Sequence, residues 1–248
     1  MTSEAALTLT TLIFAAALLY SAVGFAGGSG YLAAMALFGV APLVMRPTAL
    51  TLNIFVAAVA TARYYRAGAF SWSVFWPFAA ASVPFAFIGG SLTLPGAVYR
   101  PVVGAILVYA AWLCLRRSTA AAEPETRKPR PGVVAVAGAA IGFLAGLTGV
   151  GGGIFLSPLI ILAAWAEVRV VSGIAAAFIL VNSAAGLLGM LSRSMALPTQ
   201  LPLWAAAAVV GGLLGSELGS RYLSSKTIQR LLAVILAVAG LRMALSIP

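Results

Sequence analysis

Histidine and aspartate are both absent from the 248 residues, and five glutamates supply all of the side-chain negative charge. Without histidine the chain has no Ser–His–Asp triad, no histidine-based metal site and no histidine proton relay. The only lysines, Lys128 and Lys226, lie in predicted loops and offer no base for a buried serine nucleophile. We therefore expect no enzyme activity, no metal and no cofactor.

Cysteine and nucleotide-binding motifs are equally scarce. Cys114 is the only cysteine, so no disulfide can form within the chain. It lies in an apolar run, which indicates a packing role. The phosphate-binding pattern G-x-x-x-x-G-K-[ST] does not occur, so we expect no ATP-driven machinery.

Charge of either sign is rare. Charged residues make up 8% of the chain and hydrophobic residues 62%, whereas a soluble domain carries about 25% charged residues. Such a chain cannot cover a water-facing surface, so we predict an all-α polytopic membrane protein whose main partner is the lipid bilayer. The net charge of +10 does not indicate nucleic-acid binding, because no soluble basic face exists.

The apolar residues fall into successive runs, several of them long enough for the ~20 residues that span a bilayer. Arginine, proline or glycine closes most of these runs. In chain order we predict apolar segments at 5–26, 31–44, 48–62, 73–94, 98–115, 133–148, 154–165, 170–191, 201–220 and 228–245. Residues 118–131 (STAAAEPETRKPRP) hold almost no bulky apolar side chain, which indicates a solvated loop.

Two glycine clusters interrupt the runs at matching places in the two halves. They are residues 27–30 (GGSG) and 149–153 (GVGGG), and an offset of 124 places Gly27 and Gly28 on Gly151 and Gly152. We therefore predict a membrane repeat at 1–117, a cytoplasmic loop at 118–131 and a second membrane repeat at 132–248. Each repeat would hold a glycine-broken helix pair and three transmembrane helices.

Loop charges favour an inverted relation between the repeats. If each broken pair enters and returns on one side, each repeat makes an odd number of crossings and its twin must be inverted. Lys and Arg gather in cytoplasmic loops, and this topology puts eleven of them inside and four outside. The eleven are Arg63, Arg66, Arg116, Arg117, Arg127, Lys128, Arg130, Arg169, Arg221, Lys226 and Arg230, and the four are Arg46, Arg100, Arg193 and Arg242. Broken pieces that span fully would leave the same loops on the same sides, so charge does not separate the two models.

Paired helix breaks of this kind indicate a transporter with its site near the bilayer midplane. Unwound backbone frees N–H groups, and helix N-termini bind oxyanions without a formal cation. Amide and hydroxyl side chains that follow the breaks can add hydrogen bonds; helix packing and interhelical hydrogen bonds are the alternative roles. The candidate substrate-binding residues are Gly27, Gly28, Ser29, Thr51, Asn53, Gly151, Gly152, Gly153, Ser172 and Asn182.

Three charged residues are further candidates. Arg46 and Arg169 each follow the short second piece of a broken pair, where they could form a vestibule that attracts anions or anchor the helix at the interface. Glu217 could carry a proton, or it could pair with Arg221 one helical turn later.

The glycine-rich stretch 147–158 (LTGVGGGIFLSP) resembles the hallmark of the TauE/SafE sulfite-exporter-type membrane proteins. Its fainter copy at 23–32 (VGFAGGSGYL), and the stretches 175–186 (AAAFILVNSAAG) and 211–221 (GGLLGSELGSR), are similar to that family as well. The resemblance covers nearly the whole chain. It implies a multi-pass protein of the bacterial inner membrane, and several members are linked to export of sulfite or organosulfonate anions. Glu217 departs from the neutral residue that the resemblance leads us to expect.

Together these features predict a secondary transporter that exports a small anion such as sulfite or an organosulfonate. An anion channel-like uniporter is the alternative, since the same groups would serve it. A homo-oligomer is compatible with the sequence, which does not fix the number of subunits.

Overall fold

The structure is a computed structural model that describes residues 3–92, 130–191 and 197–224, with separate residues between 101 and 116 and between 226 and 241. All regular structure in these described parts is helical, so the predicted all-α class is confirmed. The helices are α1 (Ser3–Ser21), α2 (Gly28–Leu37), α3 (Pro42–Arg66), α4 (Trp72–Ser91), α6 (Pro131–Thr148), α7 (Gly153–Leu162), α8 (Val168–Met190) and α9 (Leu201–Arg221).

Six of these helices are long and apolar enough to cross a membrane: α1, α3, α4, α6, α8 and α9. The other two, α2 and α7, have ten residues each, about half of what a bilayer requires. Each short helix follows a glycine cluster and precedes a long helix. The predicted order of long and short segments is therefore present in both described halves.

The prediction was wrong at one segment boundary. The sequence suggested that Arg46 and Pro47 end a segment, but α3 begins at Pro42 and continues through both residues. Pro42 fits the first turn of a helix, where its missing N–H would have no partner. Pro47 lies only one turn further on, and membrane helices tolerate proline when neighbouring groups satisfy the backbone. Arg46 is consequently a residue of the helix rather than of a loop.

Some predictions fall on residues that the structure does not describe. They concern Cys114, the loop at 118–131 except for its last two residues, and most of the segments 98–115 and 228–245.

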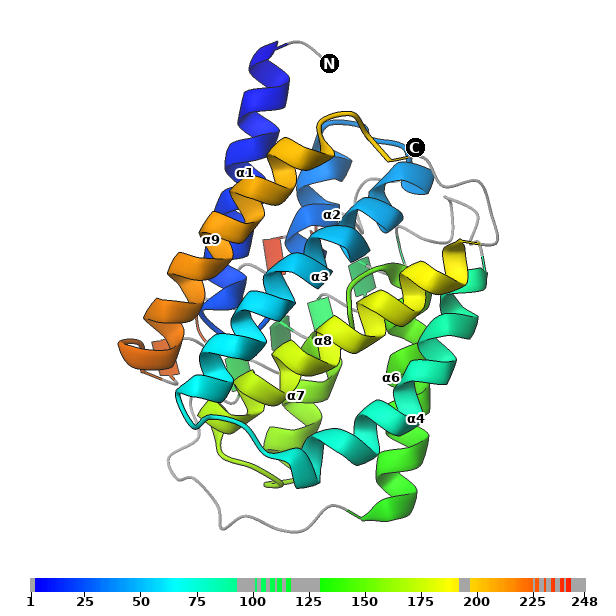
Figure 1. Ribbon diagram of the computed structural model, residues 1–248, viewed down its shortest axis with the longest axis vertical. Coiled ribbons are helices and arrows are strands. Elements are labelled where there is room, and N and C mark those ends of the chain that lie inside the picture. Colours follow the sequence, from blue (N-terminus) through cyan, green and yellow to red (C-terminus); the bar gives the residue numbers. More distant parts are fainter. Residues whose placement is uncertain are drawn as a thin grey trace.

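The long helices pack in five main pairs: α4 with α6, α1 with α9, α4 with α8, α3 with α8, and α3 with α9. In Figure 1, α1 and α9 both descend along one side, α4 and α6 both rise along the other, and α3 and α8 cross the middle in opposite directions. We can match α1, α2, α3 and α4, in this order, with α6, α7, α8 and α9. Exchanging each helix for its match turns every pair into another pair of the same set or into itself. Each outer pair therefore combines one helix from each half of the chain.

Glycines let the outer pairs approach closely. A β-carbon added to Gly215 of α9 would overlap the carbonyl oxygen of Leu18 on α1, and one on Gly146 of α6 would overlap that of Ala86 on α4. Within lipid the hydrophobic effect does not drive helix association, so close packing of small residues has to supply the contact energy.

Two apolar clusters flank the α3–α8 pair. One combines buried side chains of α1, α2 and α3 with Trp204 of α9, and the other combines those of α6, α7 and α8 with Phe78 of α4. Each cluster thus packs one broken helix pair against a helix from the other half, and the first cluster also includes Val150 and Ile154 of the second half.

Candidate functional site

The first glycine cluster ends one helix and starts another. After Ser21 the chain leaves α1, and Gly27 precedes α2 with a φ of 106°, a left-handed conformation that glycine adopts without strain. No side chain caps the N-terminus of α2. The first N–H groups of a helix have no partner within it, so those of α2 are available to a ligand.

The second cluster repeats this geometry. Gly152 precedes α7 with a φ of 82°, and again no side chain caps the helix. The two short helices start at Gly28 and Gly153, an offset of 153 minus 28, or 125. The structural match is therefore shifted by one residue from the offset of 124 that the sequence suggested.

The two breaks meet around Asn53 of α3. A β-carbon added to Gly28 would lie 2.6 Å from Asn53 Nδ2 and 2.8 Å from the carbonyl oxygen of Val150. One added to Gly151 would lie 3.0 Å from the same Nδ2 and 3.1 Å from Ser183 Oγ of α8. The two breaks, which come from opposite halves of the chain, thus meet at a single point. The Asn53 amide and the Ser183 hydroxyl lie at the same point.

Polar atoms without partners lie in these two helices. Asn53, Asn182 and Ser183 are fully buried, yet within the described part of the chain Asn53 Oδ1, Asn182 Oδ1 and Ser183 Oγ have no hydrogen-bond partner. A buried polar group without a partner costs roughly 1–3 kcal/mol. A water molecule would donate to the two amide oxygens, whereas the Ser183 hydroxyl can itself donate to a ligand.

The two asparagines are placed differently. Asn53 Nδ2 makes only a long contact of 3.4 Å to the Gly149 carbonyl, whereas Asn182 Nδ2 donates to the Phe178 carbonyl of its own helix at 2.8 Å. Asn53 is therefore the amide that faces both breaks. The sequence lists both residues as candidates, but only the tertiary packing of α3 against the breaks distinguishes them.

Tyrosines support the first break. Ser29 Oγ donates to Tyr20 Oη at 2.9 Å, and the Tyr31 hydroxyl donates to the Ala26 carbonyl. Both rings are buried. Sequence reasoning missed Tyr20 and Tyr31, because an aromatic residue in an apolar run resembles any other packing residue.

Two candidate hydroxyls form hydrogen bonds within their own helices. Thr51 Oγ1 donates to the Pro47 carbonyl at 2.8 Å and Ser172 Oγ to the Val168 carbonyl at 3.3 Å, in each case within the residue's own helix. The backbone of Ser172 packs instead against Gly24, close to the end of α1.

Comparison with known proteins agrees with this architecture. The family model described as sulfite exporter TauE/SafE matches residues 9–243. "Probable membrane transporter protein y4hK" of Sinorhizobium fredii is 42% identical over 241 residues, which cover 96% of this chain and 98% of that protein. The chain belongs to the TauE/SafE family. It is a multi-pass membrane transporter and not an enzyme. No solved structure matches it.

In this TauE/SafE transporter Arg46 is buried, with 5% of its surface exposed. Its guanidinium donates to the carbonyls of Gly89, Gly90, Leu92 and Gly146 at 2.6 to 3.0 Å. These carbonyls belong to the last turn of α4, the residue after it, and α6. The arginine thus occupies the negative end of the α4 dipole and ties α3 to both helices. A vestibule residue would be exposed to solvent, and Arg46 is not.

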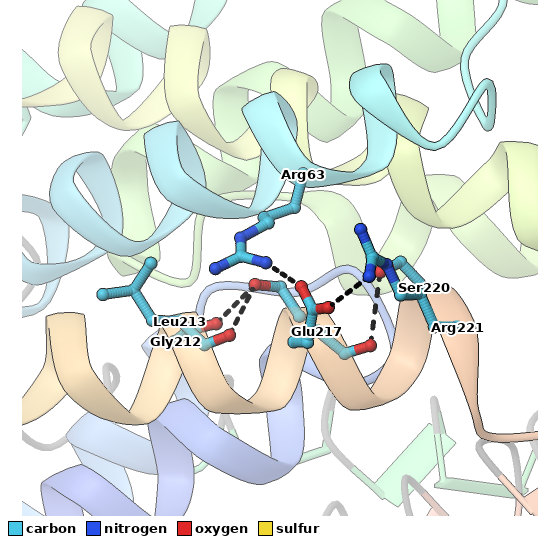
Figure 2. A network of polar contacts seen from close by, with 7 residues as sticks. Arg63, Gly212, Leu213, Glu217, Ser220 and Arg221 are labelled. Atoms are coloured by element: carbon cyan, nitrogen blue, oxygen red, sulfur yellow. Dashed lines mark hydrogen bonds and ion pairs between the residues drawn. The ribbon is translucent and has the colours of Figure 1, made fainter.

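The other two charged candidates, Arg169 and Glu217, lie at helix ends and not where Arg46 lies. Arg169 is exposed at the start of α8. Glu217 of α9 forms ion pairs with Arg63 of α3 and, at 3.0 Å, with Arg221 one turn later (Figure 2). The predicted pairing with Arg221 is present, and the carboxylate lies at the end of α9 rather than beside the glycine breaks.

Proposed function

We propose that this TauE/SafE protein is a secondary transporter that exports a small, sulfur-containing oxyanion such as sulfite or an organosulfonate. The convergence of both glycine breaks on Asn53 carries the proposal. Gly28, Val150 and Gly151 meet there within contact distance, although they come from opposite halves of the chain.

The chemistry of this point favours an anion. The uncapped N-terminus of α2 begins at Gly28, beside Asn53, and the uncapped N-terminus of α7 begins two residues after Gly151, the residue of the second break that adjoins Asn53. Each N-terminus carries a partial positive charge of roughly +0.5. The amide of Asn53 and the hydroxyl of Ser183 add hydrogen-bonding groups. An oxyanion with three or four oxygens could accept from all of these groups at once, with no formal cation in the site.

The state of the breaks favours a carrier over an open channel. Residues 22–29 and 145–154 are all buried, so the point where the breaks meet is closed to solvent in this conformation. A transported anion would have to separate the breaks and bind between them. In alternating access the protein closes around one bound ion and then opens to one side of the membrane at a time.

An inverted two-fold relation between the halves would provide the two sides of this cycle. The predicted repeats are supported by the helix pairs, which exchange when α1 to α4 are matched with α6 to α9. The opposite directions of α3 and α8 in Figure 1 also support them. In the cycle the α1–α9 side and the α4–α6 side would rock about the α3–α8 pair.

A ligand panel tests the proposal. The full chain in detergent is heated with sulfite, sulfate, thiosulfate, sulfoacetate or taurine, and the apparent Tm is recorded. A ligand that binds only the folded state stabilises it by about 2.7 kcal/mol at a hundred times its Kd. We expect at least one sulfur oxyanion to raise the Tm of the wild type by more than it raises that of Gly28→Ala. Equal shifts in both proteins would place the binding site elsewhere.

A further inference from the structure

A cleft of about 490 Å³ lies between the last turns of α3 and α9, and none of the residues that line it belongs to the glycine breaks. Apolar residues of both helices form part of its wall. Its polar lining consists of Arg63, Arg66, Glu217, Ser220 and Arg221. Figure 2 shows Glu217 between the Arg63 side chain above it and Arg221 on its own helix.

The charges of the cleft do not balance. Three guanidinium groups face one carboxylate, which leaves a formal excess of two positive charges. Glu217 divides its oxygens between two arginines, Oε2 toward Arg63 and Oε1 toward Arg221. Arg66 is exposed and forms no ion pair with any other described residue.

We propose that this cleft is a second oxyanion site, in which the Glu217 carboxylate occupies the position of the ligand when no anion is bound. A carboxylate and a sulfite or sulfonate group present similar oxygens to an arginine fork. An entering anion would displace Glu217 from Arg63 and bind between Arg63 and Arg66. Because ion pairs of this exposure are weak, with 36% of the Arg63 side chain and 29% of the Glu217 side chain exposed, a free anion can compete with this internal carboxylate.

The position of the cleft suggests its use. The loop charges predict that the ends of α3 and α9 face the cytoplasm, which is the side from which an exported anion enters. The cleft would then collect the substrate before it reaches the glycine breaks, and Glu217 would release the anion by returning to Arg63. This role rests on the proposed export function, whereas the binding of an anion to the cleft does not.

Equilibrium binding of radiolabelled sulfate to the full chain in lipid-free detergent tests the site. All variants carry Gly28→Ala, so that the cleft is measured with the central site blocked. Adding Glu217→Gln removes the internal competitor, and we expect the Kd to fall about tenfold. Adding Arg63→Gln as well should abolish that gain. Arg130→Gln, an exposed arginine at the start of α6, is the control and should leave the Kd unchanged.

A second measurement does not depend on any variant. Phenylglyoxal labelling of the wild type, read by mass spectrometry, should show Arg63 and Arg66 protected by sulfate and Arg130 unprotected. An unchanged Kd in Glu217→Gln together with equal labelling in the presence of sulfate would overturn the proposal. So would protection of Arg63 and Arg66 by phosphatidylglycerol but not by sulfate, because the cleft would then bind a lipid headgroup. Failure of the export function would appear separately, as the absence of sulfite flux through proteoliposomes that contain the wild-type protein.

Discussion

Gly28 and Val150 lie in opposite halves of the chain, yet a single β-carbon on Gly28 would come within 2.8 Å of the Val150 carbonyl oxygen. The same β-carbon would lie 2.6 Å from Asn53 Nδ2. The two helix breaks are therefore one structural unit rather than two separate irregularities. A substrate held by one break would contact the other, which gives the transporter a direct link between its halves.

Substitutions of Asn53 test whether the site binds an anion or a neutral polar ligand. Asn53→Asp keeps the shape of the side chain but places a negative charge beside both breaks. We expect it to lower the affinity for a sulfur oxyanion at least tenfold more than Asn53→Ala does, because a like charge repels the ligand while alanine only removes hydrogen bonds. Titration of the ligand by thermal shift gives the two affinities. Aspartate that binds the anion as well as asparagine does would show that the site is not built for negative charge.

Arg46 should matter for stability more than its place in a membrane helix suggests. Arg46→Gln removes charged hydrogen bonds to four backbone carbonyls, and we expect a loss of about 3 kcal/mol. Arg169→Gln is the matched control, since that arginine is exposed and a surface change costs about 0.5 kcal/mol or less. Thermal unfolding in detergent compares the two. Equal Tm values would mean that water replaces the arginine at the end of α4.

Close approach of α1 and α9 depends on Gly215. Gly215→Ala places a methyl group against the Leu18 carbonyl, and we expect a loss of about 1–3 kcal/mol from overpacking. Gly132→Ala is the control, because no atom lies within 4 Å of its added β-carbon. The apparent Tm should fall for Gly215→Ala alone. A similar Tm for both variants would indicate that the α1–α9 pair can separate without cost.

Membrane potential should drive export, since no nucleotide-binding motif is present. An inside-negative potential of 100 mV is worth about 2.3 kcal/mol per charge, or about a 50-fold change in the distribution of a monovalent anion. Proteoliposomes loaded with sulfite should therefore empty faster when valinomycin and a potassium gradient make the interior negative. Efflux that is equally fast with the potential clamped at zero would exclude this mode of coupling. Saturation of the flux with concentration would separate a carrier from a channel.

The sequence predicted the helices and their breaks well, because both depend on local chemistry. Runs of apolar residues set the six long helices, and glycine clusters set the left-handed turns at Gly27 and Gly152. Arg63, Arg66 and Arg221, which the loop charges assign to one side of the membrane, line one cleft. The side on which they lie stays a prediction.

Residues that act through tertiary contacts could not be assigned in this way. Arg46 is a charged residue followed by a proline, a pattern that is typical of a loop. Only the packing of α3 against α4 and α6 shows that its guanidinium binds backbone carbonyls. Asn53 and Asn182 are both amides in apolar runs. Their difference lies in which face of the helix meets the breaks, and this depends on helix packing across the two halves.

The most direct test is sulfite flux through proteoliposomes that contain Gly28→Ala or Gly132→Ala. Both changes add one methyl group to a glycine, but the first places it between Asn53 and the second break and the second places it in open space. We predict that Gly28→Ala lowers the saturable flux at least tenfold and Gly132→Ala leaves it unchanged. Wild-type flux through correctly folded Gly28→Ala would contradict a substrate site where the two breaks meet.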